Sequence, residues 1–270
     1  MNRARVMTLI GKELREFRAN PAAILPVVLV VALCTLVPFI VVIVVPKVIG
    51  QSMATDHDLQ RIIEAARQRM PGLAGLAPQA ATEAFFFQQF LLLFLIAPIV
   101  GAVSLAAYTV VGEKQGRTLE PLLTSPLSTS ELLVAKALAS FLPSLVMEAV
   151  GLCVYLGLVA LLASPGVLES MLSFRTLLMV GVMGPFASLA ALQATIAVSS
   201  RVNDPRSAQQ IAVLLVMPLM LMLVGQVSGA FFLPSSILLV FSVAMALTWV
   251  VLIFLSVALF ERETILTRWK

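Results

Sequence analysis

Charged residues are scarce in this sequence: they make up 12% of its 270 residues, whereas 60% are hydrophobic and the mean hydropathy is +1.03. A soluble domain of this length could not bury so much apolar surface, which excludes the soluble globular class. Cysteine is scarce as well, and Cys34 and Cys153 both fall inside apolar runs, so the sequence indicates no disulfide framework. These shortages favour an integral membrane protein.

The sequence also lacks the common motifs of nucleotide binding and catalysis. It has no Gly-x-x-x-x-Gly-Lys-Ser/Thr phosphate loop, so we expect that the chain does not hydrolyse ATP itself. It has no His-Glu-x-x-His motif and no paired intramembrane Asp, which argues against an intramembrane protease, the enzyme alternative. The one histidine, His57, stands between two Asp residues and should cap a helix, because a metal site needs several converging ligands. We therefore predict no catalytic residue, no metal and no cofactor in this chain.

Six apolar runs are each long enough to cross about 30 Å of hydrocarbon as a helix. They cover residues 22–45, 85–111, 132–162, 176–199, 211–232 and 236–260. The strands of a membrane barrel would be shorter and strictly alternating. The predicted fold class is an all-α integral membrane protein, with six transmembrane helices in a single domain over residues 1–270. No inverted repeat is visible, which disfavours a carrier driven by an ion gradient, the main alternative.

Basic residues are distributed unevenly between the two ends of these spans. Six spans put both termini on one side, and thirteen of the 18 Lys and Arg residues fall on that side. The positive-inside rule therefore predicts a multi-pass protein of the inner (plasma) membrane with both termini cytoplasmic. The net charge of +4 does not indicate a nucleic-acid partner, because no basic surface interleaved with aromatic residues lies outside the spans.

Two segments outside the spans have the spacing of amphipathic helices. Residues 1–20 predict a cytoplasmic interfacial helix, held by apolar burial and by anionic lipid of the membrane, although a basic flank that only sets topology is the alternative. In the external loop 47–84, a second amphipathic helix should end at Pro71-Gly72 and cover the outer face of the bundle or a partner copy. The two apolar faces consist of Val6, Leu9, Ile10, Leu14 and Phe17, and of Leu59, Ile62, Ile63, Ala66 and Met70.

The loop over residues 112–131 is densely polar but carries an apolar stripe. Leu119, Leu122 and Leu123 fall at i, i+3 and i+4, which places them on one face of a short helix. Charged residues surround this stripe, so it should meet a protein rather than lipid. The loop ends in a capping box, Ser128-x-x-Glu131, that should begin the third span.

The second cytoplasmic loop, residues 201–210, has a helix start of its own. Asp204 is placed to cap the fifth span, and Pro205 occupies the first helical position, where the missing N–H costs nothing. Glycine pairs at Gly181 and Gly184, and at Gly225 and Gly229, provide small faces for close helix contact.

The first of these loops resembles the cytoplasmic coupling loop of type-2 (ABC-2) permeases of ATP-binding-cassette exporters, of the sodium or drug efflux kind. The resemblance rests on the run Glu-Lys-Gln-Gly-Arg-Thr-Leu-Glu-Pro-Leu-Leu-Thr-Ser-Pro at residues 113–126, which departs from the family pattern at one residue, Arg117, between Gly116 and Thr118. The Asp-Pro-Arg-x-Ala-Gln-Gln run from Asp204 is a second match.

The resemblance implies a mechanism that the residues alone do not. Two permease copies, or this chain and a related one, would form the path and bind separate ATPase subunits, which hold ATP and Mg²⁺. Exported substrates of such permeases include sodium, drugs, lipids and glycans, and the sequence does not choose among them. The residues implied in ATPase coupling are Glu113, Gly116, Thr118, Leu119, Glu120, Leu122 and Leu123.

Few polar residues interrupt the apolar runs. Glu148 lies midway along the third run, where a carboxylate costs about 2.5–3.5 kcal/mol, so it should face the bundle interior. Gln193 and Gln226 are candidate partners at comparable depth. Two interpretations stay open: a polar feature or proton-sensitive latch of the translocation path, and a buried helix–helix hydrogen bond.

Overall fold

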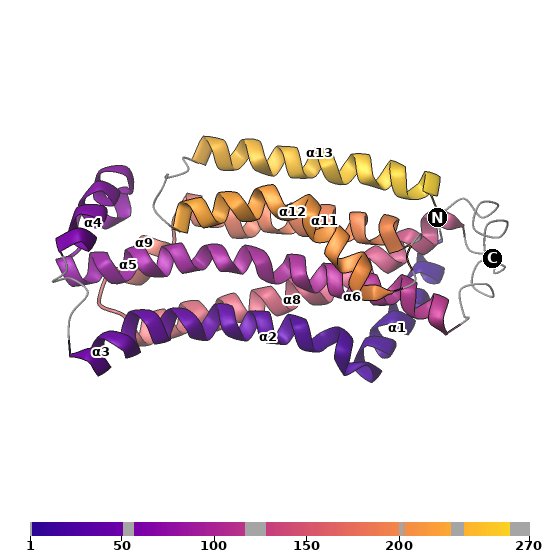
Figure 1. Ribbon diagram of the computed structural model, residues 1–270, viewed down its shortest axis with the longest axis horizontal. Coiled ribbons are helices and arrows are strands. Elements are labelled where there is room, and N and C mark those ends of the chain that lie inside the picture. Colours follow the sequence, from indigo (N-terminus) through magenta and orange to yellow (C-terminus); the bar gives the residue numbers. More distant parts are fainter. Residues whose placement is uncertain are drawn as a thin grey trace.

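Every regular element in the described part of the chain is helical. The computed structural model describes residues 2–50, 57–116, 128–199, 202, 204–227 and 235–259. Within those ranges it contains no strand, and most of the long helices run along one axis, with α1 and α4 inclined to it at the two ends (Figure 1). They are α1 (Arg3–Ala19), α2 (Pro21–Phe39), α4 (His57–Arg69), α5 (Pro78–Leu91), α6 (Ile96–Gln115), α8 (Thr129–Leu162), α11 (Gly184–Ser199), α12 (Pro205–Val227) and α13 (Ser235–Leu259).

Shorter turns join these helices into continuous rods. The first span passes through a π-helical turn, η1 (Ile40–Val44), into α3 (Val45–Ile49), and the 3₁₀ turn η4 (Leu92–Leu95) joins α5 to α6. The remaining short elements are η3 (Pro71–Leu73), α9 (Val167–Met171), α10 (Phe174–Leu178) and a second π-helical turn, η5 (Met179–Met183).

In the described part of the chain, five helical stretches are long and apolar enough to cross a membrane: Ala23–Ile49, Pro78–Glu113, Ser130–Leu162, Phe174–Ser199 and Ser235–Val257. They coincide with five of the six predicted runs, and this confirms an all-helical membrane protein. The other predicted run, 211–232, lies mostly in α12, which is not among the five. α12 packs beside α11 and extends from one end of the bundle toward the other (Figure 1).

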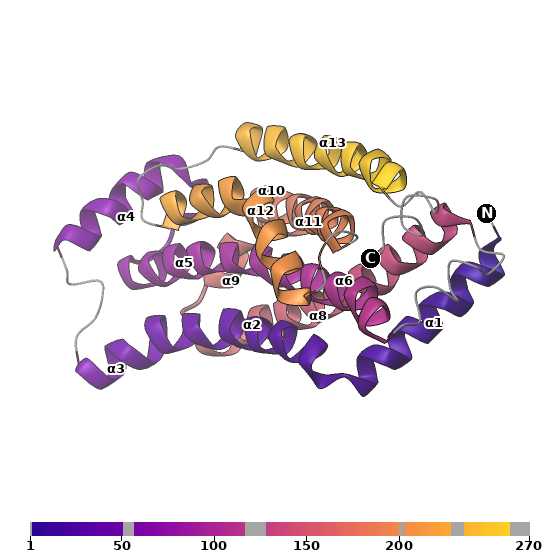
Figure 2. The same ribbon diagram turned by 45° about the vertical axis from the view of Figure 1, so that its right-hand side comes forward.

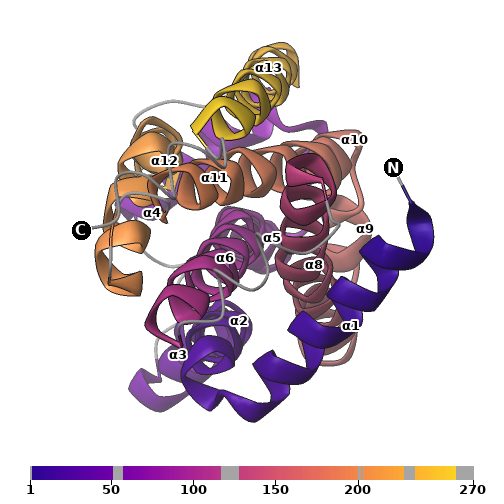
Figure 3. The same ribbon diagram turned by 90° about the vertical axis from the view of Figure 1, so that its right-hand side faces the viewer.

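α6 forms the centre of the bundle. Seen from the end, it lies among α2, α8, α11 and α12, while α13 lies at the periphery (Figure 3). Burial follows this arrangement, because 78% of the most apolar stretch of Pro78–Glu113 is buried, against 17% of that of Ser235–Val257. The exposed apolar side chains of α13 and α2 therefore form the surface that lipid would cover.

Two helices lie at opposite ends of the long axis. α1 crosses one end at an angle to α2, and α4 lies at the other end (Figures 1 and 2). Val6, Leu9, Ile10 and Phe17 of α1 are buried against the bundle, mainly on α8, whereas Leu14 is 38% exposed. The face that the sequence predicts to be buried in lipid is thus largely buried in protein, since α8 offers it a matching apolar surface.

The helix predicted in the external loop is present as α4. It begins at His57 and ends at Arg69, directly before the 3₁₀ turn at Pro71. The next helix, α5, begins at Pro78 rather than near residue 85. The helix of the second span therefore starts inside the predicted loop 47–84. Pro78 at the first helical position explains this early start.

The core contains an aromatic cluster around Tyr155 and two points of very close helix contact. Tyr155 is fully buried and donates a hydrogen bond of 2.8 Å to the Phe87 carbonyl. A Cβ on Gly151 would lie 2.4 Å from Val31 Cγ1, and one on Gly101 would lie 2.8 Å from Ser144 Oγ. These two glycines therefore allow α8 to approach α2 and α6.

Candidate coupling site

Four charged side chains meet where α1 crosses the bundle, and we call them the charge cluster: Lys12, Glu13, Glu113 and Lys136. Glu13 lies three residues after Ile10 and four before Phe17, so it belongs to the buried face of α1. Lys136 likewise follows Leu132 by four residues on the buried face of α8. Glu113 comes from the end of α6, so the cluster joins three helices.

Lys136 is the centre of the charge cluster. Its Nζ donates hydrogen bonds to Glu13 Oε1 at 2.9 Å and to the Thr109 carbonyl at 2.6 Å, and it lies 2.7 Å from Glu113 Oε2. Lys136 thus makes two hydrogen bonds and one ion pair inside the bundle. Lys12 Nζ completes the cluster with a hydrogen bond of 2.7 Å to Glu113 Oε1.

The charge cluster is almost closed to solvent. Glu13 and Lys136 are fully buried, Glu113 is 4% exposed, and only the Lys12 side chain, at 34%, reaches the surface. Buried charges of this kind persist only when they are paired, because an isolated one loses its hydration without compensation. The two carboxylates and two ammonium groups satisfy that condition.

The surroundings shift the pKa values of the two α1 members. Burial raises the pKa of Glu13 above its ordinary value, although the charge of Lys136 opposes this shift. Burial alone would lower the pKa of Lys12, but its hydrogen bond to Glu113 and the charge of Glu113 outweigh burial and raise this pKa. Lys12 therefore keeps its charge, and Glu13 binds a proton more readily than it would in water.

A second contact fixes α1 to the start of α8. Ser128 and Glu131 form the predicted capping box, with the Ser128 Oγ accepting from the Glu131 N–H at 3.2 Å. The Glu131 carboxylate also accepts a hydrogen bond of 2.6 Å from the Asn2 N–H. The same residue thus begins α8 and binds the first turn of α1.

These contacts surround both ends of the 112–131 loop. Glu113 lies in the charge cluster, and Gly116 forms an exposed turn in which its N–H donates to the Gly112 carbonyl at 2.9 Å. The other predicted coupling residues, Thr118, Leu119, Glu120, Leu122 and Leu123, lie outside the described residues. The helices on each side of the loop and α1 are therefore joined through buried ion pairs.

α12 begins at Pro205, inside the predicted second loop 201–210, as expected. Asp204 accepts a hydrogen bond of 3.0 Å from the Ser207 N–H, and the helix starts at Pro205. The Ser207 hydrogen bond lowers the pKa of Asp204, so the cap stays ionised. This start lies at the same end of the bundle as α1 (Figure 1).

The structure separates the residues predicted for the translocation path. Glu148 is 3% exposed in α8, and its Oε1 has no hydrogen-bond partner among the described residues. A Cβ on Gly184 would lie 3.5 Å from that oxygen. Gln193, also buried, is nine residues farther along α11, roughly 13 Å at 1.5 Å per residue. Gln226 lies near the end of α12, and its side chain is outside the described residues.

Lys12, Glu13 and Lys136 were not among the residues predicted for the site. The available signal was position: Glu13 interrupts the apolar face of α1, and Lys136 stands inside an apolar run. A charged residue at a core position of a helix requires a partner, and the opposite signs of these two could have suggested the pair. His57 lies at the start of α4, and no cluster of three metal-binding side chains occurs in the described ranges.

The comparison with protein families covers nearly all of these elements. A family model described as "ABC-2 family transporter protein" matches residues 7–261, from α1 to beyond the end of α13. No individual curated protein matches the chain significantly.

Proposed function

Because the chain belongs to the ABC-2 family of transporter proteins, we propose that it is the permease subunit of an ATP-driven exporter. Two copies, or this chain and a related one, form the translocation path. Separate ATPase subunits bind ATP and Mg²⁺ and dock on the 112–131 loop. The chain itself transports and does not catalyse.

The charge cluster is the observation that carries this proposal. It joins α6, which leads into the loop, to α8, which leaves it, and to α1, through ion pairs of 2.7–2.9 Å. A force applied to the loop therefore moves α1, α6 and α8 together, because the ion pairs hold these three helices to one another. α6 then transmits it into the centre of the bundle, because this helix contacts α2, α8, α11 and α12.

This geometry supports a transport cycle driven by the ATPase subunits. Closure of the ATPase subunits on ATP pushes on the loop, and the α1–α6–α8 body rocks between inward-open and outward-open arrangements. ATP acts only through contacts that differ between the two arrangements, as any shift of a conformational equilibrium requires. The π-helical turns in the first and fourth spans, η1 and η5, are wider than α-helical turns, a feature often found at functional sites.

The proposed topology has six spans, with α12 as the fifth. α1, the end of α6, the start of α8 and the start of α12 lie at one end of the bundle, which we assign to the cytoplasm (Figure 1). The excess of Lys and Arg on that side supports this assignment through the positive-inside rule. α4 then lies outside the cell, and the protein resides in the inner (plasma) membrane.

The test of this function is the double substitution Leu119→Asp with Leu122→Asp. Burial of one such leucine in a partner groove is worth roughly 1.5–3 kcal/mol, and a carboxylate placed there adds a desolvation penalty of several kcal/mol. We expect the variant to insert normally and to lose co-purification of the ATPase and stimulated ATP hydrolysis in lipid. Thr124→Asp with Ser125→Asp adds the same charge off the stripe and should retain both. An unchanged ATPase partnership in the Leu variant would refute the coupling role.

A gradient-driven carrier is the second candidate, and Glu148 is the observation that favours it. A buried carboxyl with an oxygen that lacks a hydrogen-bond partner is costly unless it has a role, and proton-driven carriers use such groups. Reconstituted vesicles distinguish the two candidates. An ATP-driven permease transports only with its ATPase and ATP, whereas a carrier responds to an imposed proton gradient alone.

A substitution at Glu148 tests whether this residue acts in either transport cycle. Glu148→Leu removes an incompletely bonded buried carboxyl, so we expect a thermal midpoint equal to or higher than that of the wild type. We also expect transport to fall, because the polar feature of the path is gone. Glu148→Gln separates polarity from ionisation in the same assay. Lower stability with normal transport would assign Glu148 a purely structural role.

A further inference from the structure

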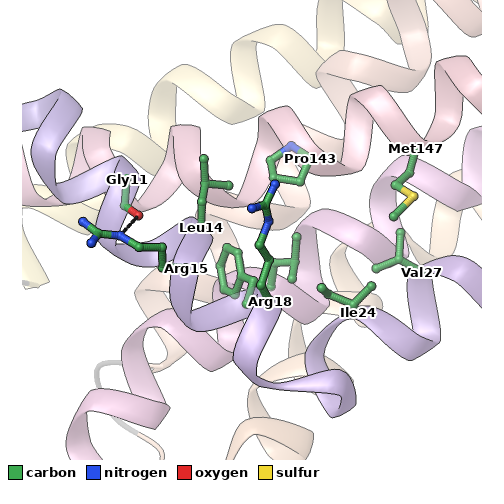
Figure 4. A pocket seen from close by; sticks show the side chains of 10 residues that line it. Gly11, Leu14, Arg15, Arg18, Ile24, Val27, Pro143 and Met147 are labelled. Atoms are coloured by element: carbon green, nitrogen blue, oxygen red, sulfur yellow. Dashed lines mark hydrogen bonds between the residues drawn. The ribbon is translucent and has the colours of Figure 1, made fainter.

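A pocket of about 450 Å³ lies between α1 and the membrane-spanning helices (Figure 4). Its walls come from α1, α2, α6 and α8, and apart from two arginines and Gly11 they are apolar. The exposed side chains of Leu14, Arg15 and Arg18 form its α1 rim, so the pocket opens to the outside of the protein. It is separate from the charge cluster, none of whose members lines it.

The rim of this pocket carries positive charge that no acidic side chain of the described residues neutralises. Arg18 extends from α1 toward Pro143 of α8, and the Arg15 Nε donates a hydrogen bond of 3.1 Å to the Gly11 carbonyl (Figure 4). No ion pair engages either guanidinium among the described residues. The acidic neighbours on α1 have other partners: Glu13 pairs with Lys136, and Glu16 lies 3.1 Å from Lys12. The rim therefore favours an anion.

The rest of the pocket runs into the apolar part of the bundle. Met147, on its wall, is 11 residues beyond Lys136 along α8, which is roughly 16 Å at 1.5 Å per residue. The outward-facing side chains beside it on α8 and α2 are apolar and exposed, among them Leu142, Val146 and Leu25. These side chains lie in candidate membrane spans, so the opening faces lipid rather than water.

We propose that this pocket binds one anionic phospholipid from the leaflet that α1 borders. The phosphate contacts Arg15 and Arg18, and an acyl chain lies along Phe17, Ile24, Val27 and Met147. An anionic phospholipid of the adjacent leaflet has a charged head and a long apolar chain in the order that the pocket presents them. A bound lipid of this kind would fill the angle between α1 and the bundle and hold α1 against α8.

Native mass spectrometry of the full chain in neutral detergent tests this site, with dioleoyl phosphatidylglycerol and dioleoyl phosphatidylcholine as the two probes. We expect the wild type to bind the first phosphatidylglycerol more tightly than phosphatidylcholine. Arg15→Gln with Arg18→Gln should weaken phosphatidylglycerol binding by about 30-fold, because each cation near an anionic headgroup is worth about 1 kcal/mol and 1.4 kcal/mol is tenfold. Inorganic phosphate should not compete, since it lacks the chain.

Two further variants separate the pocket from the general charge of α1. Arg3→Gln with Arg5→Gln removes two charges from the same helix away from the pocket, and it should leave binding unchanged. Gly11→Leu fills the pocket without a change of charge and should weaken the binding of both lipids. The helix can accept this side chain, because a Cβ at Gly11 meets no atom within 4 Å. Equal losses in the two arginine pairs, or full binding in Gly11→Leu or in the Arg15 and Arg18 variant, would overturn the proposal.

Discussion

At the scale of single residues, Lys136 has the most demanding position in the structure. It is fully buried, and its ammonium serves Glu13, Glu113 and the Thr109 carbonyl at once. Removal of one partner of a buried pair is far more costly than replacement of both, because the remaining charge stays buried without compensation. The four members of the charge cluster should therefore respond very differently to substitution.

We predict that Lys136→Met lowers stability by about 3–5 kcal/mol, since it removes the closest cation of the buried Glu13 and leaves only Lys12, 3.7 Å away. Lys12→Met, at the partly exposed edge of the cluster, should cost about 1 kcal/mol or less. Glu13→Gln added to Lys136→Met should restore much of the loss. Thermal unfolding of the detergent-solubilised protein measures all three variants. Similar losses for Lys136→Met and Lys12→Met would contradict this account of the cluster.

The cluster also marks the limit of prediction at the residue scale. The helix starts at Ser128 and Asp204 could be predicted because a cap is made within four residues of the chain. The pair of Glu13 with Lys136 joins residues 123 apart, and local periodicity does not say which helix faces meet. The family resemblance implied that Glu113 is a coupling residue, which stays a prediction, and it did not indicate the partners of Glu113 in the charge cluster.

At the scale of elements, glycine decides how closely the helices approach. The sequence directed attention to Gly181 and Gly184, and a Cβ on Gly184 would lie 3.1 Å from Leu95, yet among the glycines described within helices the closest contacts occur at Gly101 and Gly151. Every apolar run has small residues on some face, and only the packed bundle shows which of them meets a neighbour. The same holds for α1, whose apolar face was predicted from its spacing but whose partner, α8, was not.

We predict that Gly151→Ala destabilises the bundle by about 1–3 kcal/mol, because the new Cβ would lie 2.4 Å from Val31 Cγ1 of α2. A valine in a helix has little rotamer freedom with which to move away. Gly157→Ala on the same helix is the matched control: its Cβ meets nothing within 4 Å, so it should stabilise by up to about 1 kcal/mol.

Adding Val31→Ala to Gly151→Ala should recover most of the loss, because it removes the atom that the new methyl group meets. Thermal unfolding in detergent again provides the measurement. A Gly151→Ala variant as stable as the Gly157→Ala variant would show that α2 moves away from α8 without cost.

At the scale of the whole molecule, the orientation in the membrane follows from which end of the bundle carries α1. In a background without Cys34 and Cys153, cysteines at Gln60 and Glu169 should react with an impermeant thiol reagent added to intact cells. Both residues are exposed near the α4 end. Cysteines at Gln115 and Gln210, at the α1 end, should react only after the inner face is opened.

The six-span topology depends on this outcome. If the cysteine at position 210 reacts from outside while the cysteine at position 115 is protected, α12 does not cross the membrane in the proposed direction. If the cysteine at position 115 reacts from outside, the 112–131 loop lies beyond the reach of a cytoplasmic ATPase. Composition alone predicted the class of the molecule, because hydropathy reports burial in lipid directly, but it does not report the tilt and contact of each helix.

The long sequence separation within the charge cluster has a consequence for how the chain is made. Lys12 meets Glu113 across 101 residues and Glu13 meets Lys136 across 123, so the first pair needs the end of α6 and the second needs the start of α8. At about 5–20 residues per second, α1 leaves the ribosome roughly 6–25 s before its partner lysine. α8 supplies both Lys136 and the apolar surface of Leu132, Ala135 and Ala139 on which α1 packs, so the buried pair with Glu13 and the burial of the apolar face of α1 form in the same step of assembly.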